Sequence, residues 1–250
     1  MGHLIKTGPG GAEADRARFA TTRWSVVRAA GEPTGPGARE ALATLCRLYW
    51  YPVYAYARRR GLDSEEAADL TQGFFARLIE RKTVRGADPD RGKFRSYLLG
   101  AFKHFMAHEW ARARAKKRGG GRRLVPLDPR EAEERYGLEP AHELTAQRLF
   151  ERQWALRLLE LAMEDLREQY TCDGRRRYFD VFRPFIAGGR GNGYREACAE
   201  LGLGEGAARV AVHRLRTRYR ELLREHIRRT VETPEQVDEE IQHLFSAVGA

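Results

Sequence analysis

The sequence predicts an all-α protein made of two small helical domains joined by an acidic linker. Apolar residues recur at the i, i+3, i+4, i+7 spacing of helices along most of the chain. Breaks rich in glycine and proline separate these segments, as at residues 32–37 and 187–193. A further stretch, residues 124–143, is punctuated by proline and holds six carboxylates against two arginines, which is typical of a connection between domains.

Composition narrows the class of protein. The chain has 250 residues, of which 42% are hydrophobic, and this is enough for packed cores. No apolar run approaches the roughly 20 residues of a spanning helix, and the N-terminus lacks the apolar segment of a secretory signal, so we expect a cytoplasmic protein outside the membrane. The three cysteines are far apart and form no CxxC pair, which argues against a disulfide framework or a zinc site. A net charge of +10 favours an acidic partner.

The first expected elements lie before residue 62. Residues 1–18 are glycine-rich and polar and are expected to be disordered. A short helix should follow, with Thr22 as its N-cap. Residues 38–60 hold a longer helical pattern in which Pro52 should kink the helix or start a new one, and Gly61 is the expected stop.

The next predicted helix covers the sequence LDSEEAADLTQGFFARLIER. Asp63 or Ser64 should cap it, and the apolar stripe Leu70, Phe74 and Leu78 should face the core. Phe75 then points away from this stripe, on the side of Asp69 and Gln72. An outward phenylalanine among polar residues favours a partner surface, and a second core contact is an equally good explanation of the periodicity.

Residues 91–123 are predicted to form a long helix that is apolar on one side and basic on the other. The segment has eleven Lys and Arg residues against a single carboxylate, Glu109. Its core stripe is expected to contain Phe94, Leu98, Ala101, Phe102, Phe105 and Met106. Aromatic side chains mixed into the basic face suit a nucleic acid, which offers phosphates for the cations and bases for stacking. The alternative is a solvated charged face on an ordinary core helix.

Helical patterns return at residue 144 after the linker. Residues 194–229 read as a short helix, a tight turn at Gly202 and a longer helix, which is the helix-turn-helix arrangement. The longer helix should bury Ala208, Val212, Leu215, Tyr219 and Leu222. Its outer face is basic and exposes Arg209, His213, Arg214, Arg216, Arg218 and Arg220.

The C-terminal tail predicts one more amphipathic helix. Thr233 should cap it, with Pro234 in its first position and Gln236 completing a capping box. Its apolar stripe consists of Val237, Ile241, Leu244, Phe245 and Val248. The opposite face is acidic, and the stripe must dock on one of the domains or on a partner.

The sequence contains no recognisable catalytic constellation. His104 and His108 are four residues apart on a helix but lack a third ligand, and the surroundings are basic. No phosphate-binding glycine loop follows a strand. We therefore predict no enzyme activity, no metal site and no cofactor.

Three blocks of the chain, in order, resemble bacterial RNA polymerase sigma factors of the extracytoplasmic-function (ECF) type. DLTQGFFARLIER is similar to the sigma region 2 helix that grips the polymerase clamp. DPDRGKFRSYLLGAFKHFMAHEWARARAKKR resembles the loop and helices that open and read the −10 promoter element. YREACAELGLGEGAARVAVHRLRTRYRELLRE resembles the region 4 helix-turn-helix that reads the −35 element. FATTRWSVV and the acidic tail are similar to a subgroup with N- and C-terminal extensions.

The resemblance implies a domain order. Residues 19–118 would form a region 2-like domain with an N-terminal helix, 119–143 a linker that threads an RNA channel, 144–230 a region 4-like domain and 231–250 a C-terminal helix. The chain would bind core polymerase, through its clamp and flap, and promoter DNA, and a regulatory partner such as an anti-sigma factor could act on it. The competing hypothesis is a stand-alone helix-turn-helix regulator in which residues 36–118 are an effector or dimerisation domain.

The resemblance also implies roles for individual residues. Asp69, Gln72 and Phe75 would contact the polymerase clamp. The loop 83–93 would receive a flipped-out base, and strand opening at the −10 DNA would involve Asp88, Arg91, Lys93, Arg95, Tyr97, Lys103, His104, Trp110, Arg112 and Arg114. The −35 DNA would be contacted by Arg209, His213, Arg214 and Arg216.

The sequence departs from the family pattern at two positions of the helix-turn-helix. Gly204 stands where the family often has a serine or threonine cap, and Ala211 stands where many members have a basic residue. The acidic face of the C-terminal helix suggests that it shields a basic face until a partner or polymerase displaces it.

Overall fold

The structure, a computed structural model, describes residues 27, 30, 37–80, 93–115, 129–139, 144–186, 193–229, 231 and 233–249. Within these ranges the chain is helical and contains no strand, which confirms the all-α class. The elements are α3 (Ala38–Arg59), α4 (Ser64–Glu80), α5 (Phe94–Ala115), α6 (Pro129–Gly137), α7 (Ala146–Cys172), α8 (Arg176–Phe182), η3 (Arg183–Phe185), α9 (Gly193–Glu200), α10 (Glu205–Arg228) and α11 (Pro234–Gly249).

Some predicted features lie outside the described residues. These are residues 1–18, the Thr22 cap, the loop 83–92 and most of the linker. Of the predicted N-terminal helix, Val27 and Ala30 are described, and both are buried in the core.

Several helix ends form as the sequence predicts, because the interactions that make them are local. Asp63 accepts from the Glu66 backbone N–H at 2.8 Å, and its own N–H donates to Glu66 Oε2, which completes a capping box at the start of α4. Thr233 and Gln236 form the same reciprocal pair before α11. Gly61 has φ +95° and Gly202 φ +63°, the left-handed conformation that ends a helix at low cost only for glycine.

Pro52 does not end a helix. α3 runs as one helix from Ala38 to Arg59 and contains Pro52 in its interior. The side chains around Pro52 are deeply buried, among them Trp50 and Val53 at 0% exposure. Tertiary packing of this stretch therefore outweighs the missing backbone donor.

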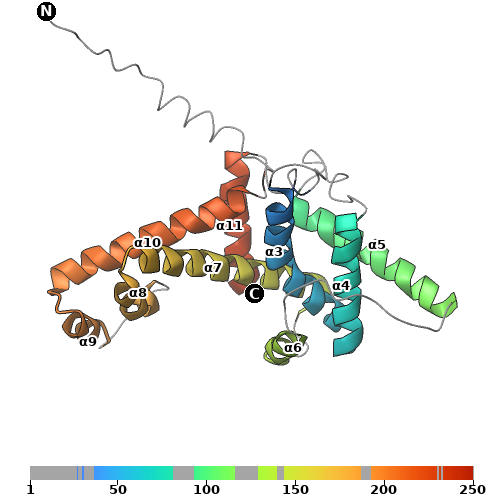
Figure 1. Cartoon of the computed structure of the whole chain (residues 1–250), viewed down its shortest axis with the longest axis horizontal. Helices are drawn as coiled ribbons and strands as arrows, with labels where there is room; N and C mark the ends of the chain where they lie inside the picture. The colour runs from blue at the N-terminus through green and yellow to red at the C-terminus, as the bar shows by residue number, and fades with distance from the viewer. Residues whose placement is uncertain are drawn as a thin grey trace, which may run out of the picture.

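Helix α7 is the central element of the molecule. Figure 1 shows it crossing the structure, with α8, α9 and α10 toward one end and α3, α4, α5 and α6 toward the other. It packs most extensively against α3 and also against α10 and α11. The buried side chains of both halves form one contiguous core, so in this structure the region before the linker and the region after it share a packed interface. The predicted division into domains stays a prediction.

Part of the acidic linker forms helix α6, which docks on α3. Ala132 is buried at 1% exposure. Glu133 accepts from the Tyr54 hydroxyl at 2.5 Å and from Arg58 at 2.6 and 2.9 Å. Hydrogen bonds, from Arg58 first and then from Tyr54, hold the pKa of the Glu133 carboxyl below its usual value against the effect of burial. An acidic composition here serves ion pairing with α3.

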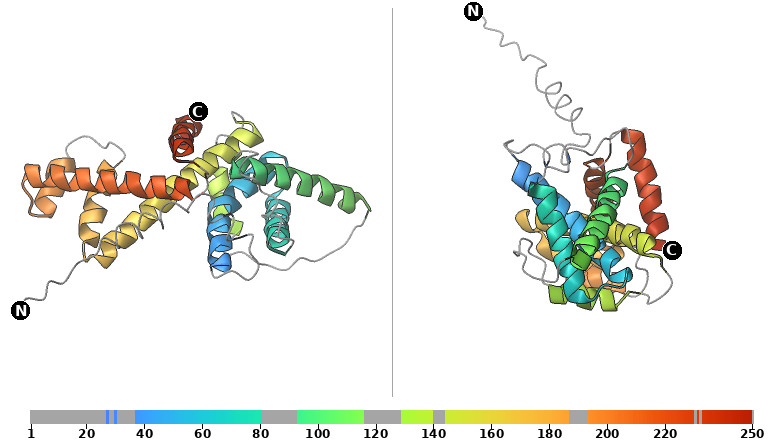
Figure 2. Two further views of the ribbon diagram at one scale, coloured as in Figure 1. Left: turned by 90° about the horizontal axis from the view of Figure 1, so that it is seen from above. Right: turned by 90° about the vertical axis from the view of Figure 1, so that its right-hand side faces the viewer.

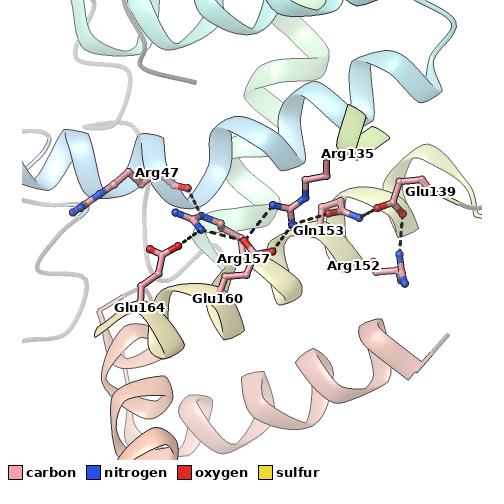
Figure 3. A network of polar contacts seen from close by, with 8 residues as sticks. All are labelled: Arg47, Arg135, Glu139, Arg152, Gln153, Arg157, Glu160 and Glu164. Atoms are coloured by element: carbon pink, nitrogen blue, oxygen red, sulfur yellow. Dashed lines mark hydrogen bonds and ion pairs between the residues drawn. The ribbon is translucent and has the colours of Figure 1, made fainter. Parts of the chain in front are cut away.

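Polar contacts also join α6 to α7 and α7 to α3 (Figure 3). Arg135 on α6 pairs with Glu160 at 2.8 Å, and its guanidinium lies 4.3 Å from the centroid of the Tyr51 ring. Arg157 on α7 donates to the Arg47 carbonyl on α3 at 3.1 Å and pairs with Glu164 at 2.9 Å. Arg135 therefore links α6 to α7 and to α3, while Arg157 links α7 to α3.

Candidate nucleic-acid interface

The two arginine-rich helices, α5 and α10, extend toward opposite ends of the elongated molecule (Figure 2). Each buries one apolar face and turns its other face outward. Helix α11 stands across α7 between them (Figure 1). The candidate interface therefore consists of two separate basic surfaces rather than one.

The apolar face of α5 largely matches its prediction. Phe94, Leu98, Phe102 and Met106 are 4% exposed or less. Phe102 lies between Phe74, at 5.1 Å between ring centroids, and Tyr56, at 6.0 Å, both edge to face. This packing holds α5 rigidly on α3 and α4 and determines which of its residues face outward.

Phe105 differs from its prediction because it is only half-buried. It lines a groove of about 320 Å³ between α4 and α5. The Arg77 guanidinium lies 5.6 Å from the centroid of the Phe105 ring, and the rest of the groove is lined by Phe74, Leu78, Ala101, His104 and His108. The groove thus combines aromatic surface with a cation and two imidazoles.

The outward face of α5 keeps four of the predicted −10 residues. Lys103 and His104 are exposed, Tyr97 is half-buried, and Trp110 is 41% exposed. Burial raises the pKa of the Tyr97 hydroxyl, so it stays neutral at physiological pH. An indole this exposed on a basic helix is a surface on which a base can stack.

The remaining predicted −10 residues cannot be placed in the same way. Asp88 and Arg91 lie outside the described residues. Arg112 and Arg114 belong to the last turn of α5, of which the structure describes the backbone. Their role stays a prediction.

Arg95 is not an outward cation in this structure, and its role at the −10 DNA stays a prediction. Its side chain is 6% exposed. It pairs with Glu151 of α7 at 2.8 Å and with Glu240 of α11, and its guanidinium lies 4.6 Å from the centroid of the Trp154 ring. The helices that follow the linker have covered this position.

Lys93, two residues earlier, is in the same surroundings. Its ammonium also pairs with Glu240, and its side chain is 33% exposed. Burial, and then the neighbouring Arg95 charge, lower the Lys93 pKa below its usual value. Lys93, Arg95, Glu151, Glu240 and His243, whose Nε2 lies 2.9 Å from Glu151, form what we call the Arg95 cluster.

The predicted polymerase-binding surface of α4 is also only partly exposed. Asp69 is exposed, but Gln72 is 8% exposed and Phe75 is 0% exposed. Phe75 packs edge to face on Phe74, with 5.5 Å between ring centroids. The expectation of an outward Phe75 is therefore wrong, and its alternative, a second core contact, is what the structure has.

The second basic surface belongs to the helix-turn-helix formed by α9 and α10. The Leu203 N–H donates to the Cys198 carbonyl at 2.9 Å across Gly202, which closes the turn. Gly204 caps α10 without a side-chain hydrogen bond, as its residue type requires. Of the residues predicted inside, Ala208, Val212, Leu215 and Leu222 are buried and Tyr219 is half-buried.

The predicted −35 residues fall into two groups. Arg209, His213 and Arg214 are exposed, and the Arg209 side chain reaches 75% exposure with a long 3.4 Å contact to Glu205. Arg216 is half-buried and donates from Nε and NH2 to the Phe185 carbonyl at 3.0 and 2.6 Å. It anchors α10 to η3 and is less accessible to a ligand than the other three.

Sequence reasoning missed the acidic half of the Arg95 cluster. Glu240 lies three residues after Val237 and four before Leu244, which are both buried, so it sits on the inner stripe of α11. A carboxylate at that position requires a cationic partner, because burying an unpaired charge is costly. That signal was present in the sequence, but it does not identify the partner.

Within the described part of the chain, no group of three or more His, Cys, Asp or Glu residues is arranged to hold a metal ion. None of the described helices is long and apolar enough to cross a membrane.

Comparison with known families bears on the first half of the chain. Residues 47–116 match the family model described as Sigma-70 region 2. The matched segment contains α4, α5 and the C-terminal part of α3. The match supports a sigma-70 family factor and, with it, a role in transcription initiation. No curated protein and no solved structure matches the chain.

Proposed function

We propose that this chain is a promoter-specificity subunit of bacterial RNA polymerase, of the ECF type with terminal extensions. It binds core polymerase, recognises the −35 and −10 elements and supports strand opening, without chemistry of its own. The observation that carries the proposal is the exposed basic and aromatic face of α5, within a segment that matches sigma-70 region 2.

The α5 face supplies the strand-opening surface in this proposal. Taking a base out of the stack costs a few kcal/mol, and a stacking surface with nearby cations can offset that cost. At about 100° per residue, Trp110 and Lys103 share one flank of α5, and Tyr97 and His104 share the other, so each flank offers a ring beside a cationic or hydrogen-bonding group. Asp88, Arg91, Arg112 and Arg114 extend this surface in the proposal.

Helix α10 supplies the duplex-reading surface. The second helix of a helix-turn-helix lies in the major groove with its first turns against base edges. Arg209, His213 and Arg214 lie in the N-terminal half of α10 and are exposed. We assign them to the −35 DNA and leave Arg216 as a supporting residue.

The polymerase contact is assigned to α4. Asp69 is the exposed residue of the predicted set, and it lies within the segment matched to sigma-70 region 2. The proposed partners are the polymerase clamp, through α4, and the flap, through the helices after the linker. The proposed compartment is the cytoplasm, and an anti-sigma factor is the proposed class of regulator.

Reconstitution with core polymerase tests the proposal. Core enzyme with this protein should give specific transcripts from a cognate promoter, and footprinting should show protection at two elements. Tight duplex binding without any association with core would contradict it and would favour the stand-alone helix-turn-helix regulator.

Matched substitutions sharpen the test. Asp69→Ala should weaken association with core while leaving the fold intact, and Glu168→Ala, the same charge change on an exposed position of α7, is its control. Trp110→Ala should reduce open-complex formation. Leu138→Ala, at an 87% exposed apolar side chain, is the control for that loss of apolar surface. Equal effects in each pair would remove Asp69 or Trp110 from the interface.

A further inference from the structure

The Arg95 cluster contains a carboxylate that is almost completely buried between two cations. The Glu240 side chain is 1% exposed. Its Oε2 accepts a hydrogen bond from Arg95 Nη1, and its Oε1 forms an ion pair with the Lys93 ammonium without a hydrogen bond. A buried carboxylate is tolerated when neighbouring cations compensate its charge. Glu240 is therefore placed specifically on these two residues and is not an incidental surface charge.

Helix α7 also covers the Arg95 side chain, through Glu151 and Trp154. Glu151 Oε2 accepts from Arg95 Nε at 2.8 Å and lies 2.9 Å from His243 Nε2, so it ties α5 to α11 through one carboxylate. Trp154 lies under the guanidinium at 4.6 Å. A guanidinium and an ammonium form charge-assisted hydrogen bonds with phosphates as well as with carboxylates, so a nucleic-acid backbone can compete for both cations.

The apolar part of the α11 contact is small. Of its apolar stripe, Val237 and Leu244 are buried, Ile241 and Val248 are half-buried, and Phe245 is 61% exposed. The Arg224–Asp238 pair, at 2.7 Å, also links α10 to α11, but its side chains are 45% and 62% exposed, and exposed ion pairs contribute little. The buried charges of the Arg95 cluster are therefore the contacts of α11 that a polyanion can replace.

We propose that α11, with Glu151, is a built-in mask over the N-terminal end of the basic helix α5. In the masked state the carboxylates of Glu240 and Glu151 occupy Lys93 and Arg95. In the bound state the phosphate backbone of DNA replaces them and α11 leaves. The mask rests on the proposed function, because DNA is the ligand that competes for these cations.

The test compares two substitutions that change the net charge equally on one helix. Glu240→Gln removes the masking charge, and Asp238→Asn removes an exposed charge, 62% exposed, from the other side of α11. The probe is a fluorescent fork DNA with a single-stranded −10 segment, followed by anisotropy across a salt series. Glu240→Gln should raise affinity about tenfold more than Asp238→Asn. It should also steepen the salt slope, because only the unsubstituted chain must first break masking ion pairs that salt itself weakens. Equal behaviour of the two variants would overturn the mask.

Two further measurements show whether the effect of Glu240→Gln comes from a folding defect. One uses a double variant, and the other uses the unsubstituted chain. Lys93→Gln should lower affinity more in the Glu240→Gln background than in the unsubstituted chain, and equal losses would count against the mask. In the unsubstituted chain, amides of residues 234–249 should exchange hydrogen faster when the fork DNA is bound. Unchanged or slower exchange would contradict displacement of α11.

Failure of the mask and failure of the proposed function are distinguishable. If core association and promoter transcripts are present but the two α11 variants behave alike, only the mask is wrong. If no variant associates with core or supports transcription, the proposed function is wrong.

Discussion

Helices α5 and α10 both carry arginines, three on α5 and seven on α10, but the surroundings of these arginines are very different. On α5, Arg95 is 6% exposed and faces carboxylates from two other helices. On α10, Arg209 is 75% exposed, and the carboxylate it contacts, Glu205 at 3.4 Å, belongs to its own helix. The comparison shows that the density of charge along a helix does not determine which charges are open to a ligand. Access depends on whether a distant segment brings a carboxylate to that position.

The largest difference between the two helices should appear in stability. Arg95→Ala leaves Glu240 buried without its guanidinium partner, and breaking a buried pair typically costs about 3–5 kcal/mol. Arg209→Ala should change the free energy of unfolding by less than about 0.5 kcal/mol, as exposed substitutions do. Urea unfolding followed by circular dichroism measures both, and similar midpoints for the two variants would contradict the comparison.

A smaller contrast is expected within α10. Arg216→Ala removes two hydrogen bonds to the Phe185 carbonyl and should cost about 1.5–3 kcal/mol, because charged donors make the stronger hydrogen bonds. Arg214→Ala should cost less than about 0.5 kcal/mol, because its side chain is exposed. Thermal unfolding of the two variants checks this, and an equal loss would mean that Arg216 is not an anchor.

A pH dependence of stability is expected from a histidine of α10. His226 on α10 is 10% exposed beside Asp165, and burial lowers its pKa although Asp165 acts in the opposite direction. The unfolded chain, with a histidine pKa of about 6.5, takes up the proton first as the pH falls. Stability should therefore be retained above that pH and be lost as the pH falls through the folded-state pKa. His226→Gln should flatten this part of the curve in urea titrations, and an unchanged curve would exclude His226 as its source.

The smallest effects should appear in the salt dependence of DNA binding. Arg209→Ala and Arg214→Ala should each lower the slope of log affinity against log salt by about one, because each variant neutralises one phosphate fewer. Binding to duplex promoter DNA at several salt concentrations measures it. A slope identical to that of the unsubstituted chain would remove the residue from the interface.

The parts of the fold that were predictable depend on neighbours in sequence. The caps at Asp63 and Thr233 and the stops at Gly61 and Gly202 involve groups within a few residues of each other. Their chemistry is visible in any short window of the sequence. The apolar stripe of α5 was predictable for the same reason, since its spacing is local.

The parts that were not predictable depend on distant segments. Phe75 is buried because α4 is covered on more than one side, and periodicity alone does not show how many neighbours a helix has. Arg95 and Glu240 are 145 positions apart, so nothing local indicates that they meet. The sequence therefore predicted which helix forms the candidate site and which side of it is basic. It did not predict which of these cations are accessible.

The length of α7 has a geometric consequence for the two basic ends. A helix of 27 residues is about 40 Å long. Helix α7 packs on α3. It also contacts α10 through two hydrogen bonds: the Tyr219 hydroxyl donates to the Leu159 carbonyl, and Arg218 donates to the Gln169 side chain. The length of α7 therefore sets the distance between the two basic ends, and its helical twist sets the direction in which each of them faces. One residue inserted into α7 between its contacts with α3 and its contacts with α10 would lengthen α7 by about 1.5 Å. It would also rotate α10 by about 100° around the axis of α7.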